Sequence, residues 1–131
     1  MALPHAQLLD VINVAPLGDK LRDAVSTSLI KTEEIQLLHM VLPARQDQPQ
    51  HHVDHACTLH CLEGDVEVVM GSGIRRLRAG NMIVLPAKQK HALRARADSA
   101  VLVTLILDSG DAGRQGGAGN QRRSDAERAG S

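Results

Sequence analysis

Residues Gly80 to His91 read GNMIVLPAKQKH and give the clearest local indication of structure in the chain. Gly80 permits a tight backbone turn, because glycine has no Cβ. The apolar run Met82–Leu85 predicts a short strand. Pro86 ends that strand, since proline has no N–H to donate to a sheet ladder. We expect His91 to begin the next strand with its side chain directed into the interior of the fold.

Short apolar segments separated by Gly, Pro and Asn continue on both sides of this stretch. About eight such segments without a helical period indicate an all-β sandwich or barrel. Ala44–Gln50 is polar and is expected to connect two strands, whereas Leu8–Val14 fits either a helical turn or an edge strand. The predicted strands are Ser26–Lys31, Ile35–Leu42, Cys57–Leu62, Val66–Met70, Ile74–Arg78, Met82–Leu85, His91–Arg96 and Val101–Leu107.

Three regions are expected along the chain. Residues 1–25 form a short irregular N-terminal segment that packs on the barrel, and residues 26–107 form the barrel itself. Residues 108–131 are rich in Gly, Ala and charged residues and lack apolar periodicity, which predicts a disordered tail. Val101–Leu107 is apolar on both faces apart from Thr104, so it is expected to be buried on both sides, either under a second sheet or in a subunit interface.

Composition excludes several classes of function. The chain has no Phe, Trp or Tyr, so bases of single-stranded nucleic acid would have no ring on which to stack. Its 15 basic and 15 acidic residues balance, which leaves no basic field for DNA, RNA or an anionic membrane. No apolar run is long enough to span a membrane, and the N-terminus lacks the features of a secretory signal. We therefore expect a cytoplasmic protein without nucleic-acid or membrane partners.

The two cysteines, Cys57 and Cys61, are expected to be reduced. On one extended strand their α-carbons would lie about 13 Å apart, at roughly 3.3 Å per residue. That separation is too large for a disulfide.

Gly80, Pro86 and His91 have the spacing of the second motif of the cupin superfamily, G-x5-P-x-G-x2-H-x3-N, and the chain resembles that family. The resemblance implies an antiparallel β-barrel, also called a double-stranded β-helix or jelly roll, as in small single-domain RmlC-like cupins of bacteria. The sequence departs from the motif twice. Ala87-Lys88 replaces the x-G step, and Ala95 stands at the final Asn position.

The first cupin motif, G-x5-H-x-H-x3,4-E-x6-G, is matched in part. Its closing Gly falls on Gly64, and counting back places the family's Glu on Cys57. One of the two motif histidines is matched at either allowed spacing, and the glutamate is missing. The histidine positions fall on His51 and Val53 at one spacing, and on Gln50 and His52 at the other.

Metal-binding cupins use three histidines and one glutamate, so the resemblance implies a site for one divalent transition metal, Fe, Mn, Ni, Cu or Zn. His51, His55 and Cys57 would share one face of an extended strand, because alternate residues point the same way. The predicted metal ligands are therefore His51, His55, Cys57 and His91. His52 is the alternative to His51, and a pocket without metal is the close alternative to the whole site.

The same pattern also bears on His60 and on the reactivity of Cys57. His60 is offset from Cys57 by an odd number of residues, so it is expected to face away from the pocket. A nucleophilic role for Cys57 is disfavoured, because apolar surroundings raise the pKa of a thiol.

The leading functional hypothesis is a cupin barrel that binds a small molecule at its mouth, with or without a divalent metal. One alternative is a metal-dependent enzyme resembling the cupin dioxygenases or isomerases, and another is a ligand-sensing module without turnover. The metal content of the purified protein would separate these classes, because bound Fe, Mn, Ni or Cu would favour catalysis and the lack of metal would favour binding alone. We also expect a homodimer that buries one face of Val101–Leu107, since small cupins commonly pair in this way.

Overall fold

The computed structural model describes residues 5–107, and within them the fold is almost entirely β-structure. One short 3-10 helix precedes the strands, and β3 is a strand that the sequence did not predict. The elements are η1 Gly18–Asp23, β1 Thr27–Lys31, β2 Ile35–Leu42, β3 Asp47–His51, β4 Cys57–Glu63, β5 Asp65–Met70, β6 Gly73–Arg78, β7 Met82–Leu85, β8 His91–Ala95 and β9 Ser99–Ile106.

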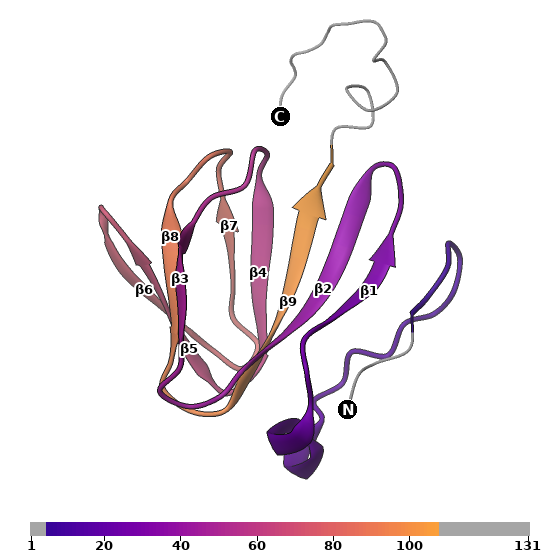
Figure 1. The fold of residues 1–131 in the computed structure, drawn as a ribbon, viewed down its shortest axis with the longest axis horizontal. Helices are drawn as coiled ribbons and strands as arrows, with labels where there is room; N and C mark the ends of the chain where they lie inside the picture. Colours follow the sequence, from indigo (N-terminus) through magenta and orange to yellow (C-terminus); the bar gives the residue numbers. More distant parts are fainter. Residues whose placement is uncertain (1–4, 108–131) are drawn as a thin grey trace, which may run out of the picture.

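The strands form two antiparallel sheets that face each other (Figure 1). The five-stranded sheet has the order β1-β2-β9-β4-β7, and the four-stranded sheet has the order β3-β8-β5-β6. The chain crosses between the sheets several times, so strands that are neighbours in space are often distant in sequence. The prediction of an all-β jelly roll is confirmed.

β9 lies at the centre of the five-stranded sheet. It pairs with β2 over its whole length, from Ile35 opposite Ile106 to Leu42 opposite Ser99, and with β4 on its other side. Ala100 and Val101 are completely buried, as expected for a strand covered on both faces. Ile106, at the end of the strand, is 47% exposed in the single chain. Its burial in a subunit interface stays a prediction.

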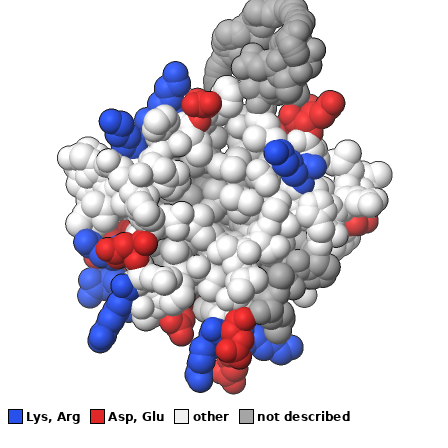
Figure 2. Space-filling model, in the orientation of Figure 1, with Lys and Arg blue, Asp and Glu red and all other residues white. Residues whose placement is uncertain are grey.

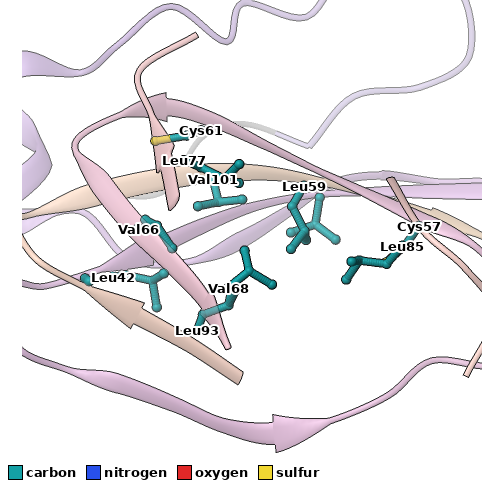
Figure 3. Packing of buried hydrophobic residues seen from close by; sticks show 12 residues of the cluster. Leu42, Cys57, Leu59, Cys61, Val66, Val68, Leu77, Leu85, Leu93 and Val101 are labelled. Atoms are coloured by element: carbon teal, nitrogen blue, oxygen red, sulfur yellow. The ribbon is translucent and has the colours of Figure 1, made fainter. Parts of the chain in front are cut away.

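The core between the sheets is aliphatic because the chain has no aromatic side chain. Leu59 on β4, Val68 on β5 and Leu93 on β8 are among its fully buried members. Figure 3 shows the cluster, with Cys57 and Cys61 at opposite ends of it. Both thiols are free, as predicted, and burial raises the pKa of each.

The outer surface of the four-stranded sheet is charged. Arg76 on β6 binds the Asp65 carboxylate, with nitrogen–oxygen distances of 2.9 and 2.5 Å. Arg94 and Arg96 both bind Glu67, at 2.8 and 3.2 Å. These guanidinium groups hold the pKa of Asp65 and of Glu67 below its usual value. On the face seen in Figure 2, charges of both signs lie at the periphery, and the middle is uncharged and hollowed.

The segment before β1 is hydrogen-bonded to the barrel at two points. The N–H of Ala6 donates to the carbonyl oxygen of Leu29 at 2.7 Å. The N–H groups of Leu17 and Gly18 donate to the two carboxylate oxygens of Glu63, at 2.8 and 3.1 Å. Among residues 5–107, no helix has the length and apolar character needed to cross a bilayer. The tail predicted over residues 108–131 lies outside the described residues.

Gly64 connects β4 to β5 in a position that only glycine fits. Its φ is +96°, in the left-handed region, and an added Cβ would lie 2.5 Å from the carbonyl oxygen of Asp98. The nearby hydroxyl oxygen of Ser99 accepts a hydrogen bond from the N–H of Asp65 at 2.9 Å. The β4–β5 turn therefore packs directly against the start of β9.

We expect Gly64→Ala to destabilise the protein more than Gly80→Ala. Both glycines have a positive φ, +96° and +92°, and an L-residue there costs about 1–2 kcal/mol. A Cβ on Gly80 meets nothing within 4 Å, whereas a Cβ on Gly64 would crowd backbone, which costs about 1–3 kcal/mol more. Urea denaturation measures both losses, and equal losses would contradict close packing at Gly64.

Candidate functional site

Two histidines lie side by side where β3 pairs with β8. His51 ends β3 and faces His91, the first residue of β8. Their ring centroids are 4.5 Å apart, and the ring planes are tilted by 54°. His91 is buried and His51 is half-buried. The pair therefore combines a fixed imidazole with one that remains partly accessible to a ligand.

An irregularity in β3 sets this pairing. Asp47 pairs with Arg94 and Gln48 with Leu93, but the register shifts by one residue before His51. Without the shift, Gln50 would stand opposite His91. The shift lies between Gln48 and His51. This span includes Pro49, which has no N–H to donate to the ladder. His51 therefore meets His91, whereas His52 is exposed, and this arrangement favours the motif spacing that includes His51.

Backbone carbonyl groups fix the orientation of both rings. Nδ1 of His91 lies 2.9 Å from the carbonyl oxygen of Gln89, and Nδ1 of His51 lies 3.2 Å from that of Pro49. A carbonyl oxygen can only accept, so each Nδ1 carries the hydrogen and donates it. In the neutral ring, Nε2 then keeps its lone pair. Each imidazole thus has one nitrogen left to accept a hydrogen bond or to bind a metal ion.

The surroundings of His91 favour its neutral, uncharged imidazole. Burial is the main reason why the pKa of His91 lies below its ordinary value, because desolvation disfavours the charged ring. The nearby His51 lowers this pKa further, while the hydrogen bond to Gln89 raises it. At neutral pH, His91 therefore offers a lone pair and not a positive charge.

The turn before β8 explains how His91 is placed. Lys88 stands where the cupin motif has its second Gly, and its φ is +65°, in the left-handed region that glycine favours. Its N–H donates to the carbonyl oxygen of Val53 at 2.8 Å. This bond ties the turn before β8 to the segment that follows β3. The left-handed conformation is retained although the glycine is not.

The other two predicted ligands are placed differently. His55 is half-buried in the connection between β3 and β4. Cys57 begins β4, pairs with Leu85 and Leu105, and belongs to the apolar core. Within residues 5–107, no three His, Cys, Asp or Glu side chains are grouped closely enough to hold an ion. The full four-residue ligand set stays a prediction.

His60 has the orientation expected from its parity. The burial of β4 alternates, with Cys57, Leu59 and Cys61 buried and Thr58 and His60 only half-buried. His60 therefore lies on the outer side of the five-stranded sheet, away from the core.

A hollow of about 220 Å³ lies near η1, at the other end of the barrel from the imidazole pair. Its walls include Glu63 and Asp98, but both carboxylates already accept backbone hydrogen bonds. Glu63 binds the N–H groups of Leu17 and Gly18, and Asp98 binds that of Ala44 at 2.9 Å. These groups serve the fold, and the imidazole pair is the stronger candidate site.

The model of the cupin domain family matches residues 38–107, which is more than half of the chain and includes both histidines. The chain belongs to the cupin family. The prediction of a small cupin domain is confirmed.

One curated protein matches part of the chain in sequence. An L-ectoine synthase of Hahella chejuensis is 32% identical over 62 residues, which cover 46% of this chain and 47% of that protein. The chain therefore aligns with about half the length of this curated relative.

Two solved structures share the fold. An RmlC-like cupin from Desulfovibrio desulfuricans is 23% identical, with a TM-score of 0.59, over 79% of this chain and 96% of that one. A conserved protein of unknown function from Streptococcus pyogenes is 18% identical, with a TM-score of 0.63, over 82% and 96%. At these identities the likeness concerns the fold alone.

The stability of this cupin is expected to fall as pH is lowered from about 7.5 to about 5. The pKa of His91 is lowered in the folded protein, so the unfolded chain binds more protons once pH drops below the ordinary value of 6.5. The loss levels off below the folded-state pKa. Urea denaturation at several pH values measures it.

His91→Gln should flatten this dependence, because glutamine does not titrate. Some pH dependence should remain from His39, which is also buried and has a lowered pKa. His52→Gln, the same substitution at an exposed position, is the matched control. An unchanged slope in His91→Gln would show that His91 does not titrate as its burial implies.

Proposed function

We propose that this cupin binds a small polar molecule at the imidazole pair of His51 and His91. The proposal rests on the contact between the two rings and on the hydrogen bond that each makes to a backbone carbonyl oxygen. Both lie together at one end of the barrel, and both donate Nδ1–H to a backbone carbonyl oxygen. Two Nε2 lone pairs are then available from neighbouring strands. Ligand sites in general are built from such a few fixed polar groups on a largely apolar wall.

The chemistry of the pair limits the ligand. A neutral Nε2 accepts hydrogen bonds, so the ligand should carry hydroxyl or ammonium donors. The chain has no aromatic residue, so a ligand that depends on ring stacking is disfavoured. A small hydroxylated or amine-bearing molecule fits these constraints best.

A divalent transition metal is the second candidate occupant. Histidines that bind metals usually donate their other ring N–H to a carbonyl or carboxylate oxygen, as both rings do here. His51 and His91 would hold the ion through Nε2, with His55 as the next predicted ligand. Cys57 is a poor fourth ligand, because its buried thiol has a raised pKa and metals bind the thiolate. A bound Fe, Mn, Ni, Cu or Zn ion would supply Lewis-acid chemistry to the ligand.

An enzyme remains the alternative to a binding protein or a sensor. The partial likeness to an L-ectoine synthase supports a synthase, and the family resemblance supports dioxygenase-like or isomerase-like chemistry that depends on a metal. Such activity requires an ion with open coordination positions, and two imidazole ligands would leave them. The expected cytoplasmic location is supported by the two free cysteines, since disulfides are formed in oxidising compartments.

Binding can be tested with the full chain, a panel of polyols, sugars and amino acids, and Ni²⁺ or Zn²⁺ alone. We expect at least one probe to shift the side-chain NMR signals of both His51 and His91. His91→Gln should weaken that binding by at least about tenfold, as expected when a direct hydrogen bond or metal ligand is lost. Isothermal titration calorimetry measures the change.

His52→Gln is the control, because His52 neighbours the site in sequence but is exposed. It should bind as tightly as the wild-type protein. A metal response without any response to organic probes would favour the metal site. Binding that survives both His51→Gln and His91→Gln would place the ligand elsewhere and contradict the proposal.

A further inference from the structure

β6 is an edge strand of the four-stranded sheet. The order of that sheet is β3-β8-β5-β6, and among the strands of residues 5–107 β6 pairs with β5 alone. In Figure 1 β6 is the outermost strand on the left, and the hairpin that it forms with β5 projects away from the other strands. One side of β6 is therefore open to a further strand.

The direction of the backbone groups on this open side follows from the end of the strand. The N–H of Arg78 donates to the side-chain oxygen of Asn81, and its carbonyl oxygen accepts the N–H of Asn81, both at 2.8 Å. Asn81 lies in the turn after β6, so these groups of Arg78 point away from β5. Backbone groups alternate in direction along a strand, so those of Arg76 and Ile74 also point away from β5. Their N–H and C=O groups can pair with a strand that docks beside β6.

The side chains along this edge are positively charged. β6 carries Arg75, Arg76 and Arg78 and has no acidic residue. Arg76 donates two of its five N–H groups to Asp65 on β5, and the side chain of Arg76 is 43% exposed whereas that of Asp65 is 20% exposed. The Arg75 guanidinium donates to the carbonyl oxygen of Ile74 at 3.4 Å. A molecule that approaches β6 therefore meets guanidinium groups, with the Asp65 carboxylate set further in.

Two occupants from the chain itself fit this edge poorly. A second copy of β6 in antiparallel pairing would place the arginines of the two copies side by side, and like charges opposite one another are destabilising. In residues 108–131, Asp125 and Glu127 have the spacing of one strand face, but Arg123 and Arg128 flank them. An acidic segment of another protein matches the charge of the edge better.

We propose that β6 binds an extended acidic segment of another protein, which adds to the four-stranded sheet as a further antiparallel strand. The backbone of the segment pairs with Ile74 and Arg76, and its side chains alternate between the two faces. The residues opposite Arg76 and Arg75 are acidic. The next residue is apolar, because it lies opposite Ile74, which is 50% exposed. From N- to C-terminus, the sequence that fits is acidic-acidic-apolar.

A nucleic acid would also supply negative charge, but it fits this edge less well. Its backbone has no ladder of donors and acceptors to pair with Ile74 and Arg76, and the chain has no aromatic ring on which bases could stack. The edge is also separate from the imidazole pair, which lies between β3 and β8 towards the opposite edge of the sheet. The inference is therefore independent of the proposed function.

The first test titrates the full chain with a capped peptide of sequence TVEEIT and follows the backbone amide signals by NMR. We expect the signals of Ile74 and Arg76 to shift. The peptide TVQQIT, which lacks the charges, should bind at least about fivefold more weakly, as should TVEEIT to the variant Arg75→Glu. Lys31→Glu is the matched control, because Lys31 is an exposed basic residue on β1, an edge strand of the other sheet. This variant should bind as tightly as the wild-type protein.

The second test separates strand addition from attraction between charges alone. An N-methyl group on the first glutamate of TVEEIT removes the N–H that donates to the carbonyl oxygen of Arg76, so this peptide should bind at least about fivefold more weakly. The same group on the second glutamate replaces an N–H that points away from β6, and this control peptide should bind like TVEEIT.

Several results would overturn the proposal. They include signals of Ile74 and Arg76 that do not respond to millimolar TVEEIT, equal binding of the two N-methyl peptides, and equally tight binding of a single-stranded oligonucleotide. Signals that shift with protein concentration alone would assign the edge to a second copy. Much tighter peptide binding by residues 1–107 than by the full chain would assign it to the tail.

Discussion

The pairing of β9 with both β2 and β4 is the interaction on which the rest of the structure depends. β9 is the last strand of the barrel, yet it occupies the centre of the five-stranded sheet. Its partner β2 lies about sixty residues earlier in the chain, so the sheet cannot close until nearly the whole barrel sequence is present. Val101 and Val103 then fill the core from this central position, and the close contact of Gly64 with Ser99 joins the two sheets at one end.

A core without aromatic rings has to be assembled from many small contributions. Each aliphatic side chain buries less apolar area than an aromatic one, so both sheets and the two cysteines contribute to a single cluster. Close packing of this kind tolerates few changes of shape. His39 is the exception, since it is buried with no partner for Nδ1 within the described residues. Burial keeps this imidazole neutral by lowering its pKa.

The candidate site arises where the regular sheet geometry is interrupted. The register shift between Gln48 and His51 brings His51 opposite His91, and the left-handed conformation of Lys88 sets the turn from which β8 begins. Carbonyl groups beside these two irregularities orient the rings. The rest of the barrel supplies a rigid frame. The outer surface of the four-stranded sheet carries the ion pairs of Asp65 and Glu67.

Much of this cupin was determined by the sequence itself. Alternating apolar residues, with Gly and Pro at the turns, predicted every strand except β3, and the motif from Gly80 to His91 predicted the barrel and the inward position of His91. These features depend on backbone geometry and on side-chain alternation, which act over a few neighbouring residues. Long-range packing accounts for the remainder. β3 is a polar edge strand around a proline and has no local strand signal. The sequence expected His51 and His91 to share a site and Cys57 to have apolar surroundings. The contact between the two rings, however, depends on the register shift in β3, and the burial of Cys57 depends on its pairing with β7 and β9. These pairings join segments that lie far apart in the chain.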